Sequence, residues 1–188
     1  MVLKRIIIVL VVILLGILGY MYFYTDVFKK PLSPKDTVEF KLNDLELEVF
    51  YNRPSKRGRA VFGALVPYDK VWRTGANEAT TFSTNKDLMI DGIYLPAGKY
   101  TLWTIPNEEN WRVFFNSKQY PWGVNDLMEP MREPRYDIVD IEIPTEALNT
   151  TVEQFTIAFD NSTDELKLTM AWDSTKIAVP LNVLKRPN

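Results

Sequence analysis

Hydrophobic and polar residues alternate along much of the chain after residue 37. In the clearest stretch, residues 45–51, apolar residues at the odd positions alternate with Glu46, Glu48 and Phe50. A period of two predicts a strand with one buried face and one wet face. Further strands are expected at 61–66, 79–84, 88–90, 93–95, 99–105, 111–116, 138–143, 152–160, 165–172 and 176–183.

Turn signals separate these stretches about every 8 to 12 residues, as in an antiparallel sandwich or jelly roll. Asp91-Gly92, between two short apolar runs, predicts a hairpin with a two-residue turn. Residues 145–149 fit one helical turn, and residues 118–136 form a long proline-containing loop of the kind that often lines a site. No long helical pattern lies between the strands, so we predict an all-β antiparallel sandwich or jelly-roll-like domain over residues 37–188.

The N-terminal stretch has a different pattern. Residues 6–25 carry no charge, and 20 helical residues span about 30 Å, the thickness of a bilayer's hydrocarbon core. Lys4 and Arg5 precede the run, which predicts a cytoplasmic N-terminus, and four aromatic residues near its end resemble an interfacial belt. We predict a transmembrane helix within a membrane anchor of residues 1–25, followed by a short tether over residues 26–36. A cleaved signal peptide is the alternative.

The composition narrows the chemistry. The chain contains no cysteine and no histidine, which excludes thiolate nucleophiles, a Ser-His-Asp triad and imidazole-bound metals. We therefore predict no cofactor and no metal, although a hard-cation site made of carboxylates remains chemically possible. Without Lys4 and Arg5, 20 basic and 24 acidic residues remain, a net charge of −4, so we expect no nucleic-acid binding.

The densest polar cluster between two predicted strands is the segment 68–80. Trp72, Arg73, Asn77 and Glu78 supply an aromatic face, a guanidinium, an amide and a carboxylate that together could grip a polyol or a carboxylate. In the alternative interpretation, Arg73 and Glu78 form an ion pair that pins the loop, and Trp72 belongs to the core.

A second candidate lies in the cationic segment 51–59. Arg53 and Arg59 flank strand ends there and are expected to point inward, toward an anionic ligand or an anionic membrane surface; a solvated loop is the alternative. Trp122, in the long loop, is the tryptophan we expect to be exposed and able to stack on a sugar ring, whereas Trp172 lies on an apolar strand face and is expected in the core.

The strings RPSKRGRAVFGALVPYDKVWRTGANEATTFST and DGIYLPAGKYTLWTIPNEENW resemble a bacterial family known as domain of unknown function 2911. The resemblance runs from about Val49 to Val183. Because that family is found in bacterial envelopes and among secreted proteins, the resemblance implies a bacterial export setting and assigns no activity, substrate or cofactor. Members of that family more often carry a cleavable signal, so the long N-terminal helix is a departure from the pattern.

Two functions follow as hypotheses. The first is a single-pass protein of the bacterial inner membrane, anchored through residues 6–25, whose periplasmic or otherwise extracytoplasmic domain is a non-enzymatic module. That module would bind a glycan or a small anion, or serve as a scaffold for an envelope protein partner. The second is a glycan hydrolase with Glu78 as general acid and Asp69 or Asp126 as its partner carboxylate.

Overall fold

The computed structural model describes residues 2–24 and 31–184. The chain forms two compact units, Met1–Leu32 and Ser33–Asn188, and each is described by itself. Residues 26–30 of the predicted tether lie outside the described residues, and residues 31–36 are described.

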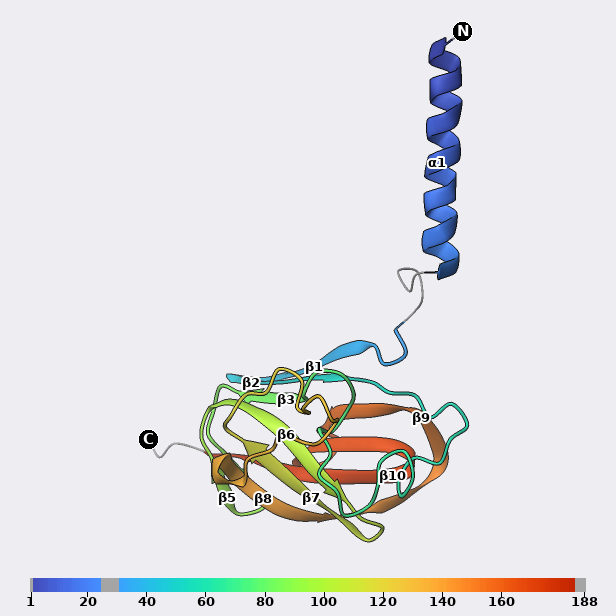
Figure 1. Cartoon of the computed structure of the whole chain (residues 1–188). Helices are drawn as coiled ribbons and strands as arrows, with labels where there is room; N and C mark the ends of the chain where they lie inside the picture. The colour runs from blue at the N-terminus through green and yellow to red at the C-terminus, as the bar shows by residue number, and fades with distance from the viewer. Residues whose placement is uncertain (1, 25–30, 185–188) are drawn as a thin grey trace. The chain divides into compact units, whose positions relative to one another are not determined.

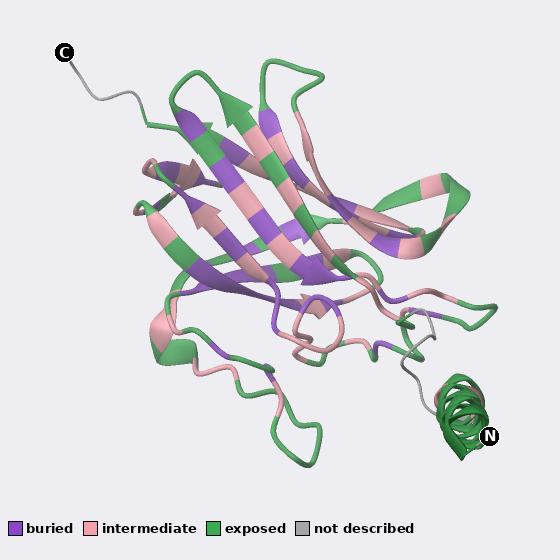
Figure 2. Cartoon of the chain, turned by 90° about the horizontal axis from the view of Figure 1, so that it is seen from above, coloured by how far each residue is buried: buried purple, intermediate pink, exposed green. Residues whose placement is uncertain are grey.

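The described residues of the first unit form the helix α1 (Val2–Tyr24), of 23 residues. Every residue from Val2 to Leu18 is exposed, although nearly all of them are apolar (Figure 2). Over Val2–Phe23 the mean hydropathy reaches 2.9, so the helix is long and apolar enough to cross a membrane. A signal sequence near the N-terminus can also be long and apolar enough to meet this criterion.

The second unit is built from two antiparallel sheets, which confirms the predicted all-β fold (Figure 1). One has six strands in the order β1-β2-β3-β6-β7-β8, and the other has four in the order β5-β4-β10-β9. Their bounds are β1 Lys35–Leu42, β2 Leu45–Asn52, β3 Thr81–Thr84, β4 Leu88–Ile90, β5 Ile93–Leu95, β6 Gly98–Pro106, β7 Asn110–Asn116, β8 Asp137–Pro144, β9 Glu146–Asp160 and β10 Leu166–Val183.

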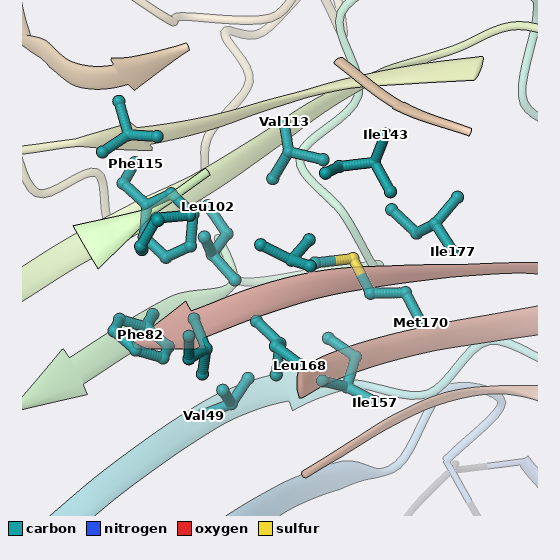
Figure 3. Packing of buried hydrophobic residues seen from close by; sticks show 14 of the residues in the cluster. Val49, Phe82, Leu102, Val113, Phe115, Ile143, Ile157, Leu168, Met170 and Ile177 are labelled. Carbon is teal, nitrogen blue, oxygen red and sulfur yellow. The ribbon is translucent and has the colours of Figure 1, made fainter. Parts of the chain in front are cut away.

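The core is filled from both sheets by side chains at alternate strand positions (Figures 2 and 3). In β2, Leu45, Leu47 and Val49 are buried, while Glu46 is exposed. Strand β10 shows the same alternation, and Trp172 on its inner face is 1% exposed, as predicted. The period-two pattern therefore reports the burial of these strands correctly.

Local turn chemistry also predicted the β4–β5 hairpin. Ile90 pairs with Ile93, and Asp91 and Gly92 between them have φ angles of 47° and 80°. Two positive φ values are what a type I′ turn requires, and aspartate and glycine adopt them at low cost. The predicted long loop is also present: residues 118–133 contain no named element, and a 3₁₀ turn (Pro134–Tyr136) ends the segment.

Three local predictions were wrong. Residues 61–66 form a turn with one Phe62–Val66 bridge instead of a strand, because the Val66 amide donates to the Val61 carbonyl and Gly63 adopts φ 80°. Residues 145–149 are extended rather than helical, since Glu146 and Ala147 pair with β10. Finally, 165–172 and 176–183 form one strand, because Asp173 lies in a bulge with φ 55° that shifts the register without ending the strand.

Candidate functional site

A pocket of about 400 Å³ lies in the β-rich unit where three loops meet. The loops are those singled out in the sequence: the cationic segment after β2 with the turn that follows it, the segment before β3, and the long loop between β7 and β8. The lining residues are Ser33, Pro54, Arg57, Arg59, Leu65, Val66, Val71, Trp72, Arg73, Gly75, Ala76, Val124, Met128, Pro130 and Trp172.

The first wall is the cationic segment, which pairs with strand β9 of the other sheet. The Lys56 amide donates to the Glu153 carbonyl (2.8 Å), and Phe155 donates to the Pro54 carbonyl (2.9 Å). These bonds fix the backbone of the segment that carries Arg57 and Arg59. The Arg59 guanidinium then folds back, donating from Nε to the Lys56 carbonyl (2.9 Å) and from Nη2 to the Ser55 carbonyl (2.8 Å).

The second wall contains Trp72, which is bound to strand β6. Its amide donates to the Thr104 carbonyl (2.7 Å), and the Thr104 amide donates back to the Trp72 carbonyl (3.0 Å). The indole Nε1 donates to the Gly75 carbonyl (3.0 Å). The Trp72 and Trp172 rings are stacked, with centroids 6.1 Å apart and planes 19° apart. Because the Trp172 Nε1 donates to the Glu153 carbonyl (3.1 Å), both indole N–H groups are satisfied within the protein.

Arg73 follows Trp72 in the chain, lines the same pocket and is half-buried. Its Nη1 donates to the Trp122 carbonyl (3.1 Å). Burial lowers the pKa of Arg73, and the charge of Glu78 acts in the opposite direction. The next residue in the long loop is Gly123, with φ 78°; a Cβ there would lie 3.3 Å from the Cβ of Arg73 and 3.3 Å from the ring of Trp103. Only glycine lets the loop approach Arg73 this closely.

The third wall is the tip of the long loop, where Asn125 organises a tight turn. The Asn125 Oδ1 accepts hydrogen bonds from the amides of Leu127 (3.0 Å) and Glu129 (2.9 Å), and the Met128 amide donates to the Asn125 carbonyl (2.9 Å). This turn presents Met128 to solvent at 64% exposure, at the edge of the pocket. The loop therefore contributes an apolar wall of defined backbone geometry.

The charge of the pocket is one-sided. Three arginines line it, whereas its lining contains no aspartate or glutamate. Across residues 2–24 and 31–184, no carboxylate forms an ion pair with Arg57, Arg59 or Arg73. A guanidinium has five N–H donors, so Arg73 retains donors for a ligand after its bond to Trp122.

Asn77 and Glu78 belong to a separate polar network. Glu78 binds Lys35 of β1 (2.5 Å) through Oε1 and accepts a hydrogen bond from the buried Asn52 (2.9 Å) through Oε2. Asn77 donates to the Asn52 Oδ1 (3.3 Å). The hydrogen bond from Lys35 is the main reason why the pKa of Glu78 is lowered. This network joins β1 and β2 to the loop before β3. Glu78 therefore pairs with Lys35, and not with Arg73 as the alternative interpretation of the sequence had it.

Arg53 and Trp122 also lie outside the pocket lining. Arg53 pairs with Asp36 of β1 (3.3 Å) and donates to the Thr156 hydroxyl of β9 (3.0 Å), so it joins the two sheets. Trp122 is 49% exposed, in agreement with the exposure expected from the sequence. Of the candidate residues, the structure thus brings Arg59, Trp72 and Arg73 together in one pocket.

Sequence reasoning did not single out Arg57, Met128 or Trp172 as site residues. Arg57 lies in the cationic segment already noted, and Met128 lies in the predicted loop, so their segments carried a signal. Trp172 was assigned to the core from its strand alternation. It is a core residue that also lines the pocket.

A second, shallower hollow of about 350 Å³ lies over the outer faces of β1, β2 and β3. Its carboxylates are Glu39, Glu46 and Glu48, and Glu46 forms an ion pair with Lys41 (3.6 Å). Within the described part of the chain, no group of three or more acidic side chains is arranged to hold a metal ion. This hollow therefore offers less defined chemistry than the arginine-lined pocket.

The arrangement is unsuited to the glycan hydrolase that the sequence left open. A general acid in that reaction needs a raised pKa so that it is protonated near neutral pH. Glu78 has a lowered pKa and is bound by Lys35, so it remains ionised. Asp69, one of the proposed partners, accepts a hydrogen bond from Asn107 (2.8 Å).

Comparison with known families gives one match. The model of a family described as "Protein of unknown function (DUF2911)" matches residues 33–181, which includes all three loops of the pocket. Neither a curated protein nor a solved structure matches the chain.

Proposed function

The chain belongs to the DUF2911 family of proteins of unknown function, and from that premise we propose that it is a non-enzymatic ligand-binding module anchored in a bacterial inner membrane. Its ligand site is the pocket between the cationic segment, the Trp72 loop and the long loop. The ligand is a small anion.

One observation carries this proposal: Arg57, Arg59 and Arg73 surround a pocket that contains no carboxylate. Three positive charges line one cavity that has no carboxylate in its lining, and together they favour an anion over a neutral ligand. Arginine also presents paired N–H donors that match a carboxylate or phosphate. Arg59 is already oriented by two backbone carbonyls, so little side-chain freedom remains to be lost when the anion binds.

The lining also supports binding without catalysis. In the pocket lining, the ionisable side chains are all arginines, and the hydroxyl side chain is that of Ser33. Arginine remains protonated under physiological conditions and is a poor proton acceptor. The polar groups of the pocket can therefore hold a negative charge but are poorly suited to transferring a proton.

The membrane part of the proposal rests on α1. Its length and hydropathy fit a bilayer span, and Lys4 and Arg5 at its start favour a cytoplasmic N-terminus under the positive-inside rule. The β-rich unit then lies on the opposite, extracytoplasmic side. Since the chain contains no cysteine, this orientation is testable with single-cysteine variants. Lys99→Cys should react with an impermeant maleimide in spheroplasts, and Leu3→Cys should react only after lysis; the reverse pattern contradicts the orientation.

The binding site is testable by ¹⁹F NMR on the full chain labelled with 5-fluorotryptophan, in nanodiscs with unlabelled scaffold protein. We expect organic acids or phosphates, but not neutral sugars, to shift the Trp72 and Trp172 signals and to leave the Trp103 signal unchanged. Arg73→Gln should weaken the response at least tenfold. The control is Arg112→Gln, which removes an exposed arginine paired with Asp140. If no anion shifts either signal, the ligand site is wrong and a scaffolding role with a protein partner is favoured.

A further inference from the structure

The pocket has a second property besides its charge: its inner surface is apolar. From the way burial changes between its floor and its mouth, we infer that the ligand is an amphipathic carboxylate, bound with its hydrocarbon end inward and its carboxylate at the arginines. This inference rests on the proposed function, since it assigns a ligand class to the same site.

The most buried lining residues are hydrophobic. Trp172 is 1% exposed and Val66 is 5% exposed, and the half-buried Trp72 and Val71 lie beside them. The two indoles form a stacked pair, and their N–H groups already donate to Gly75 and Glu153. The floor therefore presents apolar ring and methyl carbons with no free indole donor. A polar ligand group placed there would lose its hydrogen bonds to water without replacement.

The cations lie farther out. Arg57 and Arg59 are exposed, and Arg73 is half-buried. Exposed hydrocarbon accompanies them at the mouth, with Leu65 41% exposed and Met128 64% exposed. A ligand that matches this gradient has an apolar body that packs on Trp72, Leu65 and Met128. Its single anionic group then lies within reach of the guanidinium groups.

The volume limits the size of that body. A volume of about 400 Å³ is near the lower end of the range for small-molecule sites, about 300–1,000 Å³. A straight-chain acid of about ten carbons fills such a space, whereas a membrane lipid with two long chains exceeds it. The pocket thus favours a medium-chain or arylalkyl acid over an intact phospholipid.

A homologous series tests the inference on the full chain. Butyrate, hexanoate and octanoate are titrated against the 5-fluorotryptophan-labelled protein in zwitterionic nanodiscs, with empty nanodiscs used to correct for partitioning. We expect the dissociation constant for the Trp72 and Trp172 signals to fall by up to about fourfold per added methylene. We expect 1-hexanol to bind at least about tenfold more weakly than hexanoate, because it lacks the charge-assisted hydrogen bonds.

Matched variants separate the two halves of the pocket. Ala76→Leu fills part of the cavity and should weaken octanoate at least tenfold while changing butyrate by less than about twofold. Met128→Ser should reduce the gain in affinity per added methylene. Met131 is an exposed methionine of the same loop that does not line the pocket, so Met131→Ser should leave this gain unchanged. Arg59→Gln should narrow the difference between hexanoate and 1-hexanol.

Two results overturn the inference. Equal affinities along the series show that the floor does not bind hydrocarbon, and equal affinities for hexanoate and 1-hexanol show that the arginines do not recognise the head group. If the series is flat but phosphate or a polar acid still binds through Arg73, the proposed function survives and this inference fails. If no anion shifts either signal, both fail.

Discussion

The hydroxyl of Tyr51 provides a sharp test of how the two sheets are joined. Tyr51 lies in β2 of the six-stranded sheet and is completely buried. Its hydroxyl accepts a hydrogen bond from the amide of Ile157 in β9 of the other sheet (3.0 Å) and lies 3.4 Å from a carboxylate oxygen of Asp36. Tyr51→Phe removes this oxygen and changes little else in the packing.

The expected cost follows from the amide that loses its partner. A buried N–H left without an acceptor costs about 1–3 kcal/mol. For a chain of this size, each kcal/mol lowers Tm by about 2–4 °C, so Tm should fall by about 2–12 °C. In urea, a loss of about 2 kcal/mol with an m-value of about 2 kcal/mol/M lowers the midpoint by about 1 M.

The assay is urea unfolding of the full chain in non-ionic detergent, followed by tryptophan fluorescence. All five tryptophans lie after residue 71, so the signal reports the β-rich unit and not the helix. Tyr68→Phe is the control, because the Tyr68 hydroxyl makes no hydrogen bond to any residue that the structure describes, and it should shift the midpoint by less than about 0.2 M. A shift that small for Tyr51→Phe, or an equal shift for both variants, would refute the reasoning.

Three further predictions use the same unfolding assay. Gly123→Ala should lower the free energy of unfolding by about 2–5 kcal/mol. A left-handed φ costs a non-glycine residue about 1–2 kcal/mol, and crowding in a packed region costs about 1–3 kcal/mol more. An unchanged free energy of unfolding would contradict the close approach of the loop to Arg73. Burial raises the pKa of Tyr51, Tyr100 and Tyr120, so the unfolded chain releases these phenolic protons at a lower pH than the folded chain. The free energy of unfolding should therefore fall as pH rises above about 10. A free energy of unfolding that stays constant from pH 8 to 11 would contradict this expectation. The lowered pKa of Glu78 contributes stability above about pH 4.3 that is lost on acidification, so Glu78→Gln should flatten the acid limb of the profile.

The strands and several turns could be predicted because their causes are local. Alternation in β2 and β10 reflects which face of each strand is buried, and Asp91-Gly92 favours a tight turn whatever surrounds it. The same local reasoning misread residues 145–149, because pairing with β10 decided their conformation. Asp173 was also misread as a strand boundary, since a bulge and a turn have similar sequences.

The candidate site was harder to predict because its geometry is non-local. Arg59 reaches the pocket because the segment after β2 pairs with β9, a strand about a hundred residues later. Glu78 is drawn into a network with Lys35, which no spacing rule connects to it. The sequence thus identified the right loops, but only the packing of the two sheets shows which of their side chains share a cavity.

The pairing of the cationic segment with β9 has a consequence for solubility. Strand β9 is at the edge of its sheet, and an uncovered edge offers unpaired N–H and C=O groups to any other chain. Residues 54–56 occupy part of that edge, and the Tyr51 hydroxyl occupies the amide of Ile157 beside it. Loss of the cationic segment would therefore uncover a template on which another chain could add a strand. Damage to this segment would then lead to aggregation as well as to loss of a ligand.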